Sequence, residues 1–138
     1  MDRRVSLSLA ERVRKPAGHA CEYCRLPQSF QEARFHLDHI VPLARGGLTT
    51  FENLALACVT CSLKKAARIH ARDPLTLKMA FLFHPRRDRW SDHFRWLPTY
   101  HLAGRTEIGR ATIYALGINR PAIIRIRRAL AGPRYLSS

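Results

Sequence analysis

Two cysteine pairs frame the stretch of sequence that decides the fold. It begins with Cys21-Glu22-Tyr23-Cys24 and ends with Cys58-Val59-Thr60-Cys61, followed by Ser62-Leu63-Lys64-Lys65. Between the pairs lie Phe35-His36-Leu37-Asp38-His39-Ile40-Val41-Pro42-Leu43, Gly46-Gly47 and Glu52-Asn53-Leu54. Two thiolates on one Cys-x2-Cys turn can bind the same ion, and two such turns complete the tetrahedral thiolate set that Zn²⁺ prefers. The spacing therefore predicts a structural zinc site made by Cys21, Cys24, Cys58 and Cys61.

Other interpretations of the four cysteines are redox dithiols or unrelated buried thiols. A redox motif normally occurs once, beside a βαβ pattern that this sequence lacks. A closed site of four thiolates has no open coordination position, so we do not expect this zinc to catalyse a reaction.

Chemistry between the cysteine pairs centres on Asp38 and His39. A carboxylate is a hard oxygen ligand suited to Mg²⁺ or Mn²⁺, and imidazole suits a general base near neutral pH. Adjacent residues of a strand point to opposite faces, so one site can use both only at a twist, a bulge or a strand end. Taken alone, an Asp-His pair is by default an ordinary hydrogen-bonded pair rather than a catalytic one. A single Asn53 is an equally weak signal, because Asn often caps helices or forms turns.

The pattern around this stretch predicts an α+β domain. We expect strands over 34–40 and 54–58, a loop over 46–50 and a helix over 60–72 that ends before Pro74. A short helix is expected within 2–16, a hairpin within 94–102, and helices over 106–116 and 120–130. We divide the chain into an N-terminal arm (1–18), a core (19–72) and a C-terminal extension (73–138) that packs on the core.

Charge is the unusual feature of the composition. The 138 residues include 24 Lys and Arg against 10 Asp and Glu, a formal net charge of +14, and all but four of the cations are Arg. Such a charge favours a polyanionic partner, with nucleic acid ahead of an anionic membrane surface. The longest apolar runs are too short to span a membrane, and the run at 5–10 is too short for a secretory signal. We therefore expect a cytoplasmic protein with reduced thiols.

The whole layout resembles the HNH endonuclease family, whose motif has the order C-x2-C, D-H-I-x-P, G-G, N-L, C-x2-C, K. The resemblance covers about residues 21–65. It implies a ββα-metal (His-Me finger) core in which Asp38 binds a catalytic Mg²⁺ or Mn²⁺, with Ni²⁺ as another candidate. It also implies that His39 activates the attacking water, and that Asn53 fixes the hairpin loop and orients His39.

One position departs from the family pattern. The residue after the last cysteine is usually His or Asn and can be the second metal ligand, but here it is Ser62. A serine hydroxyl is a poorer ligand, which acts through a bridging water or not at all. Either the metal is held weakly, or His36 or His84, the latter the more suggestive, supplies the missing contact.

Basic residues near the predicted site are candidates for contacts with nucleic acid. They are Arg45, Lys64, Lys65, Arg68, Arg86 and Arg87. Arg86 and Arg87, with Arg89 and Arg95, also alternate with Trp90, Phe94 and Trp96. These aromatic side chains either stack on bases or, as we prefer, anchor the C-terminal part by packing.

The sequence thus favours an enzyme that hydrolyses DNA phosphodiester bonds with one divalent metal, with RNA as another substrate to test. An alternative of a different class is a zinc-containing nucleic-acid-binding module whose catalytic site is weak or inactive. A third is a nuclease-derived toxin or interaction subunit that needs a partner.

Overall fold

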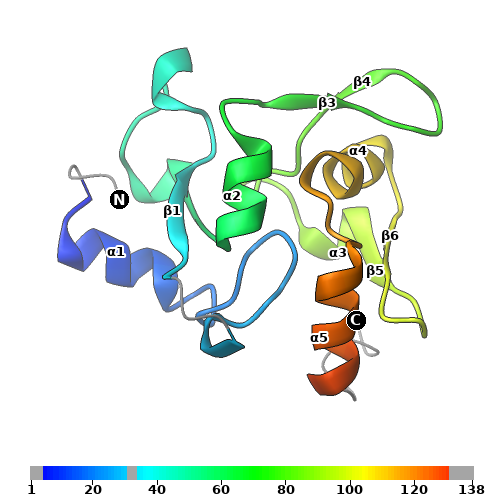
Figure 1. Ribbon diagram of the computed structural model, residues 1–138. Coiled ribbons are helices and arrows are strands. Elements are labelled where there is room, and N and C mark those ends of the chain that lie inside the picture. Colours follow the sequence, from blue (N-terminus) through cyan, green and yellow to red (C-terminus); the bar gives the residue numbers. More distant parts are fainter. Residues whose placement is uncertain (1–4, 31–33, 131–138) are drawn as a thin grey trace. The chain divides into compact units, whose positions relative to one another are not determined.

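The computed structural model describes residues 5–30 and 34–130. Helices and small two-stranded sheets make up two compact units along the chain (Figure 1). The first unit comprises the described residues up to Ile69 together with His84–Arg87. The second comprises His70–Phe83 and the described residues from Asp88 onward.

The first unit is built around a hairpin of β1 (His36–His39) and β2 (Leu54–Ala57), which pair antiparallel with Asp38 opposite Ala55. Helix α2 (Val59–Lys65) follows β2 almost directly, so the order is strand, strand, helix. All four residues of β2 are buried, which makes this strand the centre of the unit's core. Both strands lie where the sequence predicts them, within shorter bounds.

Helix α1 (Leu7–Arg14) packs against strand β2 of the hairpin. The side chain of Ser6 caps it by accepting a hydrogen bond from the backbone N–H of Leu9 at 3.2 Å. Ala10 and Val13, three residues apart and so on one face, are buried, and α1 lies against β2. Short 3-10 turns at Gln28–Phe30, Leu43–Arg45 and Phe51–Asn53 complete the connections.

The expected helix over 60–72 is wrong in its second half. Helix α2 ends at Lys65, and Ala66 has the positive φ of 50° that breaks the helical path. His70–Arg72 instead forms strand β3, which pairs with β4 (Met79–Phe81). The turn between them is set by Asp73, whose Oδ1 accepts from the backbone N–H of Leu75 at 3.0 Å. Cross-strand pairing thus overrides the helix propensity of Lys, Ala and Arg.

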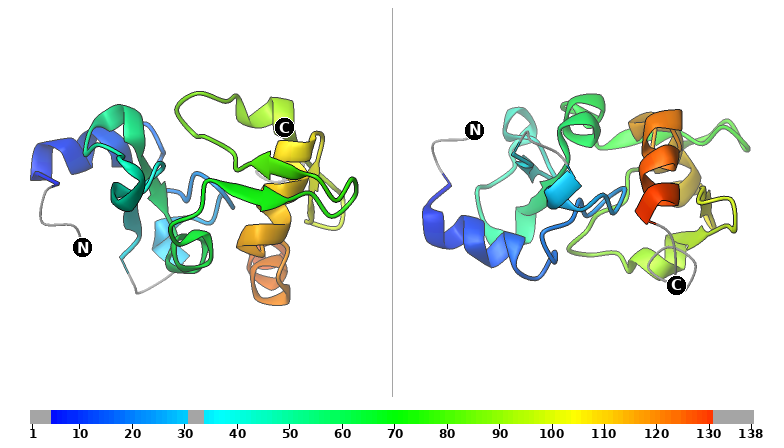
Figure 2. Two further views of the ribbon diagram at one scale, coloured as in Figure 1. Left: turned by 90° about the horizontal axis from the view of Figure 1, so that it is seen from above. Right: turned by 60° about the horizontal axis from the view of Figure 1, so that its bottom comes forward.

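The second unit adds α3 (Trp90–His93), β5 (Phe94–Trp96), β6 (Leu102–Gly104), α4 (Glu107–Leu116) and α5 (Pro121–Leu130). Strands β5 and β6 pair antiparallel, so the expected hairpin exists, with its second strand ending two residues later than predicted. Helix α4 lies beside β3, β4 and β6, as Figure 2 shows from two further directions. Both predicted C-terminal helices are confirmed to within one residue.

The core of the second unit explains its aromatic residues. The Trp90 ring lies 5.2 Å from Phe94 and 5.6 Å from Trp96, measured between centroids. The buried guanidinium of Arg127 lies 4.8 Å from the Trp96 centroid and donates to the carbonyl oxygens of Tyr100 and Ile118. These contacts support the packing interpretation of the aromatic cluster.

No helix within the described ranges combines the length and the apolar character needed to cross a membrane.

Candidate metal and catalytic site

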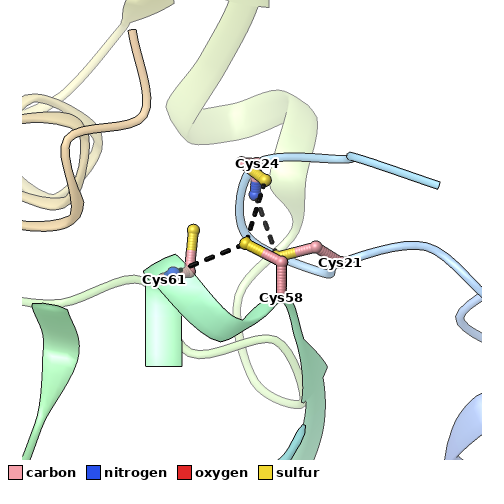
Figure 3. A group of neighbouring side chains, drawn as sticks. All are labelled: Cys21, Cys24, Cys58 and Cys61. Carbon is pink, nitrogen blue, oxygen red and sulfur yellow. Dashed lines mark hydrogen bonds between the residues drawn. The ribbon is translucent and has the colours of Figure 1, made fainter. Parts of the chain in front are cut away.

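Four cysteines meet in the first unit (Figure 3). Cys21 and Cys24 lie on the turn after α1, Cys58 is the N-cap of α2, and Cys61 lies in the first turn of that helix. All four are buried, and their sulfur atoms lie within 4.8 Å of one another. Tertiary structure thus brings the two Cys-x2-Cys turns to one place.

The arrangement of the sulfur atoms fits a tetrahedral ion. Zn–S bonds of about 2.3 Å place ligand sulfurs about 3.8 Å apart, and the Sγ atoms of Cys24 and Cys58 are 3.7 Å apart. That separation is far beyond a disulfide bond of about 2.05 Å, and all four thiols are free. The backbone N–H groups of Cys24 and Cys61 point at Cys21 Sγ (3.5 Å) and Cys58 Sγ (3.4 Å). The cluster can therefore hold a metal such as zinc.

Burial makes charge on this cluster costly without an ion. Desolvation raises the pKa of Cys21, and hydrogen bonding among the thiols raises the pKa of Cys61 while it lowers that of Cys58. Hydrogen bonds from the neighbouring thiols thus stabilise the charged form of Cys58, and ionisation of Cys21 and Cys61 becomes less favourable. A divalent cation would supply the positive charge that lets all four ionise.

Asp38 is held in the interior by two donors. Its Oδ2 accepts from the Tyr23 hydroxyl at 3.2 Å and lies 3.1 Å from Lys65 Nζ. Both charged side chains are buried, with 9% of Asp38 and 1% of Lys65 exposed. Burial raises the pKa of Asp38 although the Lys65 ammonium acts to lower it. Within the described residues, Oδ1 of Asp38 has no hydrogen-bond partner.

His39 is the last residue of β1, and its ring points to the loop that follows. Its Nε2 lies 2.9 Å from Thr49 Oγ1, and its carbonyl oxygen accepts from Lys65 Nζ at 3.1 Å. A cleft of about 520 Å³ is lined by both Asp38 and His39, together with Ser62. The end of the strand thus allows two adjacent residues to border one cleft.

Asn53 fixes the loop between the two strands. Its Oδ1 accepts from the backbone N–H of Val41 at 2.9 Å, and its Nδ2 donates to the carbonyls of Val41 (3.0 Å) and Leu48 (2.8 Å). Gly47 lies against this amide, where a Cβ would collide with the Val41 carbonyl and with Asn53 Nδ2. Gly46 has a positive φ of 87° that favours glycine.

Ser62 forms a hydrogen bond with one of the two histidines that the sequence suggests as metal ligands. His36 Nδ1 and Ser62 Oγ are 2.8 Å apart, and both residues line the cleft. His84 is not among the residues that line it, and its Nδ1 accepts from the backbone N–H groups of Arg86 and Arg87 at 3.2 Å. Among the described residues, the four cysteines are the only His, Cys, Asp or Glu group of three or more that can hold one ion.

The predicted nucleic-acid contacts have different surroundings. Four of them are exposed: Arg45, Lys64, Arg68 and Arg87. Arg45 donates to the carbonyl oxygen of Ala67 just after α2, and Arg68 donates to that of Lys64 within α2. Lys65 is buried against Asp38. Arg86 forms two hydrogen bonds of 2.7 and 2.8 Å with the Glu22 carboxylate and lies over the Phe51 ring.

Four residues of the site had no prediction from the sequence. Tyr23 and Thr49 hold Asp38 and His39, while Arg14 and Arg34 line the cleft. Tyr23 lies between the two cysteines of the first pair, so the sequence could have indicated that it lies near the site. Thr49 and Arg34 lie within the matched segment but are not motif residues, Arg14 lies before it, and only the fold brings these three to the site.

In the comparison with known families, residues 21–68 match the model of the family described as HNH endonuclease. The matched segment runs from the first cysteine to Arg68, which is about a third of the chain, and it includes Asp38, His39 and Asn53. The resemblance of this segment to HNH endonucleases is thus confirmed. Neither a curated protein nor a solved structure matches the chain.

Proposed function

We propose that this protein is a metal-dependent HNH endonuclease that hydrolyses phosphodiester bonds of DNA. The observation that carries the proposal is that Asp38 and His39, at the end of β1, border one cleft beside Ser62. A carboxylate for a divalent ion and an imidazole for a water molecule are the two groups that this hydrolysis needs. The family match over residues 21–68 supports the same activity.

In this proposal β1, β2 and α2 form the ββα-metal core, and the four cysteines hold a structural zinc ion that joins its two ends. The ion ties the turn that ends at Cys24 to the start of α2 at Cys58, across 33 intervening residues that include Asp38, His39 and Asn53. A four-thiolate site is closed, so zinc there stabilises the fold and takes no part in the reaction. Reduced thiols suit a cytoplasmic location.

The residues of the cleft fit a catalytic Mg²⁺ or Mn²⁺. Asp38 offers a carboxylate whose Oδ2 is already fixed by Tyr23 and Lys65, and Ser62 offers a hydroxyl. Mg²⁺ commonly takes one or two carboxylates and fills its other positions with water and substrate phosphate, so a single Asp suffices. When bound, the ion neutralises charge that develops on the phosphate and leaving oxygens.

The remaining steps belong to the chain itself. We assign His39 as the general base: in the tautomer whose Nε2–H donates to Thr49 Oγ1, Nδ1 carries the lone pair that takes the proton of the attacking water. Asn53 is a positioning residue, because its bonds to Val41 and Leu48 fix the loop that carries Thr49. Lys65 is assigned to holding Asp38, which leaves exposed cations such as Lys64 and Arg45 for phosphate contacts.

A nicking assay tests the activity. Supercoiled plasmid is incubated with zinc-loaded protein in chelexed buffer, then with Mg²⁺, Mn²⁺ or Ni²⁺ added. We expect metal-dependent nicking that falls by at least about 100-fold in His39→Ala, since general bases contribute about 10²–10⁴-fold. The matched control is His101→Ala in the β5–β6 turn, whose side chain bonds only to nearby Thr99 among the described contacts. Equal cleavage by His39→Ala and His101→Ala would refute the mechanism.

A second candidate is a zinc-containing module that binds nucleic acid without cleaving it. The bond between Ser62 and His36 favours it, because a hydroxyl engaged with imidazole is a weak ligand for a second metal contact. Absence of nicking with every metal, by folded protein that still retards DNA in a gel, would replace the enzyme with this module.

A further inference from the structure

Two arginines that are not among the HNH motif residues border the candidate catalytic cleft. Arg14 is the last residue of α1, and Arg34 precedes β1 by two residues. Both line the cleft of about 520 Å³ that contains Asp38, His39 and Ser62. Both also line a second hollow of about 380 Å³.

The positive charges of these two side chains repel each other, and the described residues compensate them only in part. Burial and the positive charge of Arg34 lower the pKa of Arg14, and Glu11, one turn earlier on α1, offsets this only in part. Within residues 5–30 and 34–130, neither guanidinium has an ion pair or a side-chain hydrogen bond. Arg86 and Arg110, by contrast, each bind a carboxylate through two hydrogen bonds.

The dipole of helix α1 explains why a cation stands at Arg14 but not why one stands at Arg34. A cation in the last turn of α1 interacts favourably with the helix dipole, and Arg12 and Arg14 both satisfy this. Arg34 lies outside every helix, however, and still lines the same two hollows. An external anion is the partner that would offset these two neighbouring positive charges. Guanidinium groups match phosphate oxygens in particular, because their planar N–H pairs bind two oxygens at once.

We propose that Arg14 and Arg34 together bind a backbone phosphate of the DNA strand, next to the phosphate that is cleaved. The inference rests on the proposed function for the identity of the strand, whereas binding of the anion does not require cleavage. Because a phosphate carries no base identity, the pair adds affinity equally for all sequences. We expect the same contact to influence which way the strand enters the cleft.

Salt-dependent DNA binding tests the pair. Affinity for a short fluorescent duplex is measured by anisotropy over a range of salt concentrations, in the His39→Ala background so that the DNA stays intact. Each contact with a duplex phosphate contributes about 0.9 to the slope of log K against log salt. We expect Arg14→Ala and Arg34→Ala each to lower the slope by about one, and Arg14→Lys to keep most of it. Lys15→Ala removes the same charge from the next residue, which is exposed and lines neither hollow, so it is the matched control.

The outcomes separate this inference from the proposed function. If both alanine variants behave like Lys15→Ala, the phosphate site is refuted, whether or not the wild-type protein cleaves DNA. If the slopes fall as expected but wild-type protein never cleaves, the phosphate site stands and the enzyme does not. Zinc content and circular dichroism check folding, and Arg34→Ala, outside every helix and strand, keeps the test decisive if Arg14→Ala fails to fold.

Discussion

Lys65 illustrates how one side chain in this protein changes its role through burial. A lysine in the last turn of a helix is normally solvated, yet the Lys65 ammonium is enclosed between Asp38 Oδ2 and the His39 carbonyl oxygen. Both contacts are to the strand end that borders the cleft. The contacts of Lys65 therefore fix the orientation of the strand end. Burying the two charges has a desolvation cost, which their mutual attraction offsets.

Removal of the lysine charge should destabilise the first unit. In Lys65→Met, Asp38 remains buried without its cation, so we expect a loss of roughly 3–5 kcal/mol at neutral pH. The pKa of Asp38, already raised by burial, rises further. A raised pKa favours the folded state only while the carboxyl is protonated, so the loss should grow as pH rises above about 4 and shrink below it.

Denaturant unfolding of zinc-loaded protein across this pH range measures the effect. Lys64→Met is the matched control, because the neighbouring lysine is exposed and should change stability little. Addition of Asp38→Asn to Lys65→Met should recover part of the loss, since no buried charge then remains unpaired. A variant no less stable than Lys64→Met would show that the ion pair does not hold the site.

Asp73 has the opposite electrostatic character. It is buried and binds Arg110 Nε and Nη2 at 3.0 and 2.9 Å, contacts that lower the pKa of its carboxyl well below the usual range. A lowered pKa stabilises the folded state above the ordinary value of about 4, and this stability is lost as pH falls. We therefore expect Asp73→Asn to be less stable than wild type at pH 7. In acid unfolding followed by circular dichroism, the difference should vanish toward low pH; a constant difference would contradict the assignment.

At the scale of elements, α4 shows how local sequence sets both ends of a helix. Thr106 Oγ1 accepts from the Gly109 N–H at 3.0 Å, and Gly117 ends the helix with a φ of 59°. Helix α2 shows the contrary case. The helix propensity of residues 60–72 is real, but Arg45 and Arg68 donate to backbone carbonyls where α2 ends, and His70–Arg72 pairs with β4.

Loss of the α4 cap should weaken the second unit. Thr106→Ala removes the acceptor for Gly109 and the 2.7 Å partner of His93 Nδ1, so we expect a loss of about 1 kcal/mol in the free energy of unfolding. Thr106→Ser keeps the oxygen and should lose much less. Thermal unfolding of the three proteins provides the comparison, and equal melting temperatures for Ala and Ser would argue against the cap.

At the scale of the whole molecule, the two compact units differ in what stabilises them. The first contains the four-cysteine cluster, while the second has a core of Phe94, Leu102, Leu116, Ile118 and Ile123 with no cysteine. If the cluster holds zinc, we therefore expect stability that depends on this metal to reside in the first unit.

Zinc removal should unfold the two units unequally. With a strong zinc chelator, we expect hydrogen exchange to lose protection in β1, β2 and α2, while α4 and the β5–β6 hairpin keep it. Cys58→Ser without chelator should reproduce the pattern. Simultaneous loss of protection in both units would mean that they unfold as one.

The sequence by itself determined the features that depend on residue type and local spacing. Two Cys-x2-Cys turns, the strand around Asp38, the cap at Thr106 and the stop at Gly117 all act within a few residues, so their chemistry can be read along the chain. Tertiary structure decided everything that depends on distant neighbours: that Lys65 is buried against Asp38, that His36 and not His84 meets Ser62, and that Arg14 and Arg34 border the cleft. The physical reason is that burial and charge pairing arise only when separate segments exclude water together.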